Sequence, residues 1–447
     1  MTDLSKCCAV AAVVAACLGV SGAHSAETTF SRQSIAAKAA DSRGYPDVVA
    51  VSGKGKSLFL WGVGAEEETS KTAWRPDVRH RGDFAAQCTY SLDKLGRMLA
   101  TRGATFNDVT VIRAYITDSR YTGALYDCLD TVYGKSSAKP AVTSADISQL
   151  AHAGMLVELE LTAALPDTAS DSAFTVYRNT QTLGTWNPGA NEVLEVTGPD
   201  RTFYFSGAHA VAYKPGEPMV AMYPGDFAKQ CDWLQQDLLR VLKAEGAVAK
   251  DVVRSTTFLA GDAGLAELLA CRGKLPKEDA FVNPGTLANI SQLSALGETY
   301  TYDSIGMAAL PAGSDPKTFV KKVVPSKIDA AVPSAVIVSG PRRTLNVAGQ
   351  GAIDAAGAVL FPGDFMAQCQ QTVQTLGTLL GAQGASIRDI AKMLVFVTDS
   401  RDAPAFRTCM AKAYPNVAQP AQTLVNVARL PKKGMMIQID ATAVTAP

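Results

Sequence analysis

The stretch Pro362-Gly-Asp-Phe-Met-Ala-Gln-Cys369 occurs in this chain two more times in closely related form. The earlier versions are Arg81-Gly-Asp-Phe-Ala-Ala-Gln-Cys88 and Pro224-Gly-Asp-Phe-Ala-Lys-Gln-Cys231, so the shared pattern is Gly-Asp-Phe-x-x-Gln-Cys. Successive aspartates of this pattern are separated by 143 and 138 residues. That period is too long for a solenoid repeat and suits a small domain. The sequence therefore predicts three copies of one domain, which cover residues 27–167, 168–312 and 313–447.

The composition is that of an ordinary globular protein. The chain has 447 residues, of which 47% are hydrophobic and 19% are charged, and its formal net charge is zero. This length suits about three domains, and the apolar fraction is sufficient for their cores. Because binding to a nucleic-acid backbone needs clustered lysine and arginine, we expect no nucleic-acid partner.

The N-terminus predicts export from the cytoplasm. Residues 7–20 form an apolar run that is too short to span a bilayer, and small residues follow it. This pattern predicts a signal peptide over residues 1–26, cleaved after Ala23 or Ala26, and a periplasmic or secreted protein. Cys17 also lies in a sequence that resembles a bacterial lipobox, so a lipoprotein anchored at Cys17 is an alternative, and a ragged N-terminal helix is another. No other segment is expected to span a membrane.

Six cysteines lie outside this leader, two in each copy. Members of a pair are always 40 residues apart: Cys88 and Cys128, Cys231 and Cys271, Cys369 and Cys409. For an exported chain this placement predicts three disulfides, and the alternative is two small buried residues per copy. No Cys-x-x-Cys or histidine spacing suggests a metal site, and we expect neither a metal nor a cofactor.

Each copy shows the same order of secondary structure. A helical apolar period follows the shared pattern, for example Leu92, Leu95 and Leu99, and its aspartate is placed to cap that helix. A β-rich run, a second helix with the second cysteine, and two final strands come next, and a hairpin-like region precedes the pattern. The order ββαβαββ predicts an α+β domain with two helices on one face of a mostly antiparallel sheet.

The third copy carries a family resemblance. It contains Gly384-Ala-Ser-Ile-Arg-Asp389 and closes with Gln419-Pro-Ala-Gln-Thr-Leu-Val-Asn-Val-Ala-Arg-Leu-Pro431. Together with the shared pattern, these stretches resemble the RidA/YjgF family, and the first copy resembles it through Lys139-Pro-Ala-Val-Thr143. The second copy is more divergent.

The resemblance implies a chorismate-mutase-like fold, homotrimers with a ligand site in each cleft between subunits, and, in many members, hydrolysis of reactive imines or enamines. By resemblance, three tandem copies are expected to form this trimer within one polypeptide, as a pseudo-trimer. Joining the copies also raises their effective concentration, which favours such an assembly. The alternatives are three copies that do not associate, or a further oligomer.

The family site implies two functional groups. The first is an arginine in a Pro-Ala-Arg-Ser-like segment, which grips a substrate carboxylate. We matched it to Val142, Thr286 and Gln422, none of which is a cation. The neighbouring hydroxyl is then kept as Thr143 and Thr423, and Leu287 replaces it in the second copy.

The second group is a glutamate on the last strand, thought in the family to place the attacking water. We matched it to Glu158, Tyr302 and Gln438, so Glu158 is the one candidate catalytic carboxylate. Glu160 points to the same face of that strand, which indicates either a pair in a cleft or a solvated strand face. The remaining candidate ligand-binding residues are Arg429 and the hairpin glycines Gly62, Gly207 and Gly349, although glycine also suits a tight sheet bend.

Two classes of function follow from these residues. The absence of the arginine from all three copies favours a protein that binds a small metabolite in its clefts and is not a standard imine deaminase. The alternative is an imine or enamine hydrolase with an altered substrate, which acts at the cleft that contains Glu158.

Overall fold

The structure is a computed structural model. It describes residues 29–33, 48–53, 55–68, 76–134, 136, 138–166, 176–179, 193–197, 200–212, 220–244, 246–281, 283, 285–308, 320–324, 335–339, 343–354, 356–415 and 419–445. The predicted leader, with Cys17, Ala23 and Ala26, lies outside the described residues.

The chain forms three units of one α+β design, as predicted. The elements of the first copy are β3 (Gly55–Leu60), β4 (Val63–Gly64), α1 (Phe84–Ala100), β5 (Val109–Ile116), α2 (Thr122–Tyr133), β6 (Ala141–Asp146) and β7 (Val157–Pro166). Those of the third copy are β17 (Val320–Val324), β18 (Ala335–Ser339), β19 (Arg343–Gln350), α5 (Phe365–Gly381), β20 (Ile390–Val397), α6 (Ala403–Ala413), β21 (Ala421–Asn426) and β22 (Ile437–Thr445).

The second copy repeats the design with additional short strands. Its elements are β10 (Asp200–Phe205), β11 (Ala208–His209), β12 (Val211–Ala212), β13 (Val220–Ala221), α3 (Phe227–Ala244), β14 (Val252–Ala260), α4 (Leu265–Arg272), β15 (Gly285–Ile290) and β16 (Tyr300–Ala308). In each copy the last strand pairs antiparallel with the strand after the first helix, and that strand pairs in parallel with the edge strand β6, β15 or β21.

The leading hairpins of the first two copies are exchanged between their sheets. The hairpin of β1 (Thr29–Gln33) and β2 (Val48–Gly53) pairs with β10 of the second copy. The hairpin of β8 (Val176–Asn179) and β9 (Val193–Thr197) pairs with β3 of the first copy. The third copy keeps its own hairpin, because β18 pairs with β19. The first two sheets are therefore each built from two distant parts of the chain.

The shared pattern is explained by the start of the first helix. Gly82 has a positive φ of 79°, a conformation that favours glycine, and Asp83 caps α1 by accepting from Ala86 N at 3.0 Å. The buried Gln87 side chain donates to Gly154 O at 2.8 Å and accepts from the backbone N of Leu156 at 2.8 Å. The equivalent contacts recur at Gln230 with Gly297 and Thr299, and at Gln368 with Gly434 and Met436. The pattern thus ties the first helix to the start of the last strand in every copy.

Three disulfides staple the two helices of each copy together, as predicted. They are Cys88–Cys128, Cys231–Cys271 and Cys369–Cys409. All six cysteines are buried.

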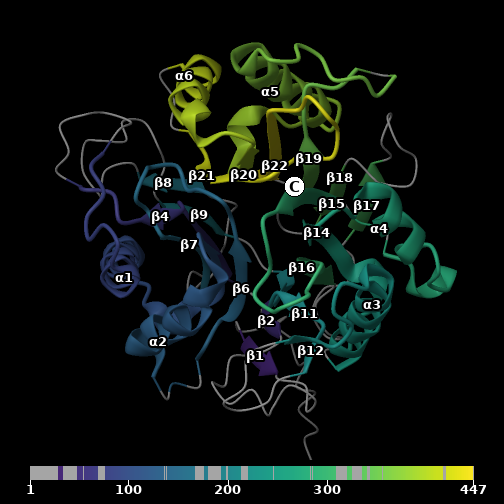
Figure 1. The fold of residues 1–447 in the computed structure, drawn as a ribbon, viewed down its shortest axis with the longest axis horizontal. Coiled ribbons are helices and arrows are strands. Elements are labelled where there is room, and N and C mark those ends of the chain that lie inside the picture. Colours follow the sequence, from purple (N-terminus) through teal and green to yellow (C-terminus); the bar gives the residue numbers. More distant parts are fainter. Residues whose placement is uncertain are drawn as a thin grey trace, which may run out of the picture.

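The helices lie on the outside and the three sheets surround a common centre (Figure 1). An apolar cluster with members from all three copies fills that centre, and it includes the equivalent aromatic residues Tyr115, Phe258 and Phe396. The rings of Phe258 and Phe396 pack edge to face with centroids 6.1 Å apart. Among the described residues, none of the helices is long and apolar enough to cross a membrane.

Candidate functional site

The copies meet at three equivalent junctions. At each junction, the hairpin glycine at or just after the end of β3, β10 or β19 contacts the edge strand of another copy. The contacts are Gly62 N to Gln422 O (2.9 Å), Gly207 N to Val142 O (3.1 Å) and Gly349 N to Thr286 Oγ1 (3.1 Å). We call them the first–third, second–first and third–second junctions. They bring together most of the site residues that were expected from the sequence.

The strand register corrects one match in the second copy. Asp146, Asn289 and Asn426 occupy equivalent positions in their edge strands. Each of them pairs in parallel with the residue at the same position near the end of β5, β14 or β20. Counting back, Thr286 is equivalent to Thr143 and Thr423, and Gly285 stands at the position of Val142 and Gln422. In the second copy Pro284 stands five residues before Asn289, whereas Pro140 and Pro420 stand six residues before Asp146 and Asn426, so a match made on the prolines is shifted by one. All three copies therefore keep the threonine, and Leu287 does not replace it.

A second correction concerns Tyr302. The register pairs Tyr115 with Glu158, Phe258 with Thr301 and Phe396 with Gln438, so Thr301 is the equivalent of Glu158. Side chains alternate along a strand, and a shift of one residue turns them to the other face. Tyr302 accordingly points toward the helices, where it is buried and donates to Leu234 O at 2.8 Å. Tyr302 does not face the junction.

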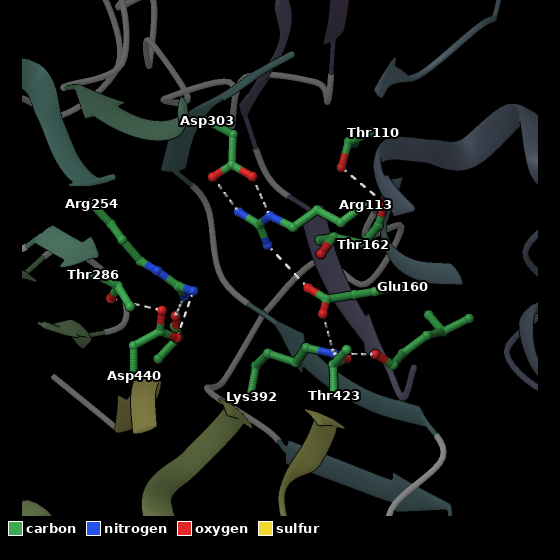
Figure 2. A network of polar contacts seen from close by, with 12 residues as sticks. Thr110, Arg113, Glu160, Thr162, Arg254, Thr286, Asp303, Lys392, Thr423 and Asp440 are labelled. Carbon is green, nitrogen blue, oxygen red and sulfur yellow. Dashed lines mark hydrogen bonds and ion pairs between the residues drawn. The ribbon is translucent and has the colours of Figure 1, made fainter. Parts of the chain in front are cut away.

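A network of buried ion pairs joins the three copies near the centre (Figure 2). Its acids are the equivalent residues Glu160, Asp303 and Asp440, and each receives a cation from another copy. The pairs are Arg113 with Asp303 (2.5 Å), Arg254 with Asp440 (2.7 Å) and Lys392 with Glu160 (3.3 Å). Arg113 also donates to Glu160 at 3.0 Å. We call these six residues the central ion network.

Within the central ion network, the charges of Glu160 and Arg113 are stabilised by their partners. Burial alone would raise the pKa of Glu160, but Lys392 and Arg113 lower this pKa to about 2. Burial would lower the pKa of Arg113, but Asp303 raises it well above its usual value. These groups stay ionised and hold the copies together, so Glu160 does not lie on a solvated face.

The first–third junction encloses a small cavity of about 20 Å³. It is lined by Trp61, Gly62, Glu66, Ala151, His152 and Glu158 of the first copy and by Phe406, Arg407, Gln422 and Leu424 of the third. This volume suffices for one water molecule. We call it the junction cavity.

Gly62 lets Glu158 reach the cavity wall. A Cβ atom at position 62 would lie 2.3 Å from Glu158 Oε1 and 2.8 Å from Thr423 Oγ1, so both side chains would have to move to accommodate it. Gly349 is equally close to Gln438, at 2.7 Å from its Cδ atom. A glycine is needed at these hairpin positions because another side chain packs directly against the backbone there. That side chain belongs either to the last strand or to the threonine of the edge strand.

The electrostatics of the junction cavity differ from those of the central ion network. Burial raises the pKa of Glu158 well above its usual value, and the negative charges of Glu66 and Glu160 raise it further. Burial lowers the pKa of His152 to about 4, helped by the nearby Arg407. Burial also lowers the pKa of Arg407 to about 10, which still leaves the guanidinium charged at neutral pH. The junction cavity therefore contains a carboxyl whose ionisation is disfavoured by burial, a neutral imidazole and a cation.

Sequence reasoning missed Glu66, His152 and Arg407. Arg407 Nη2 lies 3.4 Å from His152 Nε2 across the junction, and Glu66 is ion-paired with the buried Lys94 at 3.1 Å. The sequence contained one signal that could have revealed Arg407, and this signal is a difference between the copies at one position. Arg407 stands two residues before the second cysteine, where the other copies have Tyr126 and Leu269.

Each of the other junctions lacks a carboxyl at the position of Glu158. At the second–first junction, Thr301 donates to Ala208 O at 2.6 Å, and Gln292 bridges to Ser119 and Asp146 of the first copy. The third–second junction presents Gln438 beside Gly349. The described residues contain no group of three or more His, Cys, Asp or Glu that could hold a metal ion.

Two wider grooves lie outside these contacts. One, of about 810 Å³, runs along the first–third junction and shares His152 with the junction cavity. The other, of about 460 Å³, lies at the third–second junction and is lined in part by Arg429. Arg429 donates to Gly261 O at 2.9 Å and to Ala263 O at 3.2 Å, so it links the third copy to the second.

The chain is similar to proteins of one family. The family described as Endoribonuclease L-PSP matches residues 68–165 and 326–445, which leaves most of the second copy unmatched. A 2-iminobutanoate/2-iminopropanoate deaminase of Rattus norvegicus is 34% identical over 136 residues, which are 29% of this chain and 94% of the relative. A protein of Pyrococcus horikoshii, described as a RutC family protein, is 33% identical over 99 residues, 22% of this chain and 77% of the relative.

Matches also occur among solved structures. A chorismatase covers 86% of this chain and 99% of its own, with a TM-score of 0.45 and 12% identity. RidA from the Antarctic bacterium Psychrobacter covers 29% of this chain and 98% of its own, with a TM-score of 0.24 and 26% identity. With the repeated sequence pattern and the rat deaminase matched over almost its entire length, the chain belongs to the RidA/YjgF family.

Proposed function

We propose that the protein binds a small metabolite at the first–third junction and is not a standard imine deaminase. One observation carries this proposal: among the three equivalent positions Glu158, Thr301 and Gln438, the single carboxyl lies at the junction that also contains a buried cation, Arg407. At the strand positions matched to the family arginine, the side chains are those of Val142, Gly285 and Gln422. A ligand would therefore be recognised differently from the ligand of a standard member.

The three domains are proposed to work as a trimer-like assembly within one chain. The central ion network supports this arrangement, because each of its inter-copy pairs joins a different pair of copies. Copies joined covalently keep their contacts independent of protein concentration, and each junction is free to diverge. One junction can then bind the ligand, while the other two only hold the copies together.

The protein is proposed to act outside the cytoplasm, in the periplasm or after secretion. The three disulfides support this location, because such bonds persist in oxidising compartments. A cleaved leader over residues 1–26, or a lipid at Cys17, would provide the route.

A second candidate function is hydrolysis of an imine or enamine at the same cavity. It is favoured by the room for one water beside Glu158, whose raised pKa suits a general acid. In this scheme, Glu158 protonates the imine nitrogen and water adds to the carbon, returning a proton to the carboxylate. The resulting carbinolamine then collapses to a carbonyl compound and releases ammonia.

The test compares equivalent positions at two junctions. Thermal stabilisation of the protein is screened against small metabolites and then repeated with Glu158→Ala and Gln438→Ala. We expect Glu158→Ala to weaken the binding of a hit at least tenfold and Gln438→Ala to leave it unchanged. A ligand that responds only to Gln438→Ala would refute the assignment of the junction.

Turnover separates the two functions. Ammonia release from 2-iminobutanoate by the wild type, abolished in Glu158→Gln with the fold retained, would establish the hydrolase. Binding without turnover would establish the first proposal, and full turnover by Glu158→Gln would remove Glu158 from the mechanism.

A further inference from the structure

A groove of about 710 Å³ lies between α5 and α6, on the outer side of the third copy (Figure 1). Its lining shares no residue with the junction cavity or with the two wider grooves. The two helices are joined by the disulfide Cys369–Cys409, and Cys409 itself lines the groove. The distance between its walls is therefore set before a ligand binds, which reduces the cost of binding. We call it the outer groove.

In the first copy, an aromatic ring of the protein occupies the equivalent of this groove. A Cβ atom at Gly96 would lie 3.3 Å from Phe106 Cε2, so the Phe106 ring packs on the glycine. The ring also packs edge to face on Tyr133, with centroids 6.0 Å apart. In the third copy, Ile387 stands at the position of Phe106 and Gly377 stands at the position of Gly96. The smaller side chain leaves the space over the glycine open.

The second copy has larger residues on the corresponding face of its first helix. Leu239 and Lys243 of α3 stand at the positions of Gly377 and Gly381, which both line the outer groove. Their side chains extend over the surface that the two glycines of α5 leave uncovered. A site of this kind is therefore expected once per chain, in the third copy.

The charge of the outer groove favours an anionic ligand. Its lining contains a single charged residue, Lys412 of α6. Helix α5 contains no charged residue, whereas α1 and α3 carry charges of both signs. Lys412 forms no ion pair with any residue that the structure describes. No acid of the lining therefore competes with a ligand for this ammonium group.

We propose that the outer groove binds a small aromatic acid, with its ring on Gly377 and its anionic group near Lys412. The ring then has the place that the Phe106 ring has in the first copy, against a glycine of the first helix. Mostly apolar walls with a few polar groups are typical of small-molecule sites of this volume. An aromatic ring buries a large apolar area and suits such walls. The site is separate from the junction cavity and does not depend on the function proposed for Glu158.

The experiment measures the binding of phenylacetate to the full chain by calorimetry. Phenylacetamide, which lacks the charge, and acetate, which lacks the ring, are the comparison ligands, and both should bind more weakly than phenylacetate. Ile387→Phe places the ring of the first copy in the outer groove, and it should weaken the binding of phenylacetate and phenylacetamide at least roughly tenfold. Gly377→Leu is a second filling variant. A Cβ atom at position 377 meets Ile387 Cγ2 at 3.6 Å, an ordinary contact, and leucine favours a helix more than glycine does.

Charge variants test the contact with Lys412. Lys412→Gln should weaken the binding of phenylacetate about three- to fivefold, as expected for an exposed ion pair, and leave that of phenylacetamide unchanged. Lys274→Gln changes the equivalent lysine of the second copy, which is ion-paired with Asp232 at 3.5 Å, and is the matched control. Glu158→Ala should also leave binding unchanged. Thermal unfolding of each variant checks that it is folded.

Each outcome has a distinct meaning. Loss of binding in both filling variants, with selective loss of the acid in Lys412→Gln, supports the proposal. Undiminished binding in the filling variants overturns it, and so does a wild type that binds neither phenylacetate nor phenylacetamide. Binding that is lost in Glu158→Ala places the ligand at the junction cavity, so the outer site fails while the proposed function stands. Self-association of the wild type that the filling variants abolish, measured by sedimentation, assigns the groove to a second copy of this chain and also overturns the proposal.

Discussion

Glu158 and Glu160 are two residues apart on β7, point to the same face of the sheet and are each 3% exposed. Their surroundings nevertheless shift the pKa values of the two carboxyl groups in opposite directions. Glu160 receives Arg113 of its own copy and Lys392 of the third copy, which lower its pKa to about 2 despite burial. Glu158 is buried with the like charges of Glu66 and Glu160 nearby, and its pKa rises well above its usual value.

This difference distinguishes the residues that hold the three copies together from the residues of the proposed site. A carboxylate whose charge is matched by cations from two copies fixes how the copies fit together. A carboxyl whose pKa is raised by burial costs stability at pH values above its usual pKa, and such perturbed groups gather at functional sites. The two glutamates therefore allow the assembly and the site to be tested separately with the same chemical change.

The largest expected effect is the loss of the charge at Glu160. In Glu160→Gln, Lys392 and Arg113 remain buried without a carboxylate between them, which should destabilise the protein by about 3 kcal/mol. The measurement is the midpoint of denaturant unfolding at pH 7. Glu158→Gln has the same change in shape two residues away, and it should leave the midpoint unchanged or raise it. Equal losses in the two variants would show that the environments do not differ as described.

The pH dependence of stability should distinguish the same two residues. The folded-state pKa of Glu158 is raised, so the folded protein binds more protons than the unfolded chain above about pH 4.5, and stability falls as the pH rises. Glu158→Gln lacks this group, and its advantage over the wild type should grow upward from pH 4.5. The maximal slope is about 1.4 kcal/mol per pH unit.

Glu160 should affect stability over a different pH range and in the opposite direction. Its pKa is lowered to about 2, so its contribution is present above about pH 4.5 and is lost as the pH falls toward 2. The penalty of Glu160→Gln should therefore shrink over that acidic range. Unfolding midpoints of wild type and both variants between pH 2 and 8 test both statements. A Glu158→Gln advantage that does not change with pH would contradict the raised pKa.

The fold of each copy could be predicted from the sequence, because the features that determine it are local and recur in all three copies. Gly-Asp-Phe-x-x-Gln-Cys specifies a turn, a helix cap and a disulfide, and those features recur in each copy. The exchange of leading hairpins had no such signal, since β2 and β9 have similar β-rich sequences.

The site could be predicted only in part. Glu158 was found through the family match, but Tyr302 and Thr286 were misplaced by one residue, because Pro284 stands one residue closer to the following strand in the divergent copy than Pro140 and Pro420 do in the others. Arg407 was missed because it reaches the site from a helix of another copy, about 250 residues along the chain from Glu158. Contacts between copies depend on packing that no single repeat encodes.

The smallest expected effect lies in the threonines next to the central ion network. Thr423 is fully buried, and its hydroxyl accepts from Lys392 Nζ at 2.9 Å. At the equivalent Thr143, both oxygens of the neighbouring Asp303 are taken by Arg113, and the Thr143 hydroxyl has no hydrogen-bond partner among the described residues.

Removing a hydroxyl should therefore have unequal consequences at these equivalent positions. Thr423→Val leaves a buried lysine with one partner fewer and should cost about 1–2 kcal/mol. Thr143→Val replaces an unsatisfied buried hydroxyl with a methyl group of similar size, so the change should be within about 0.5 kcal/mol or slightly stabilising. Denaturant unfolding of the two single variants measures the difference. Equal costs would mean that Thr143 has a partner in solution, and that the ring of contacts around the centre is more symmetric than described.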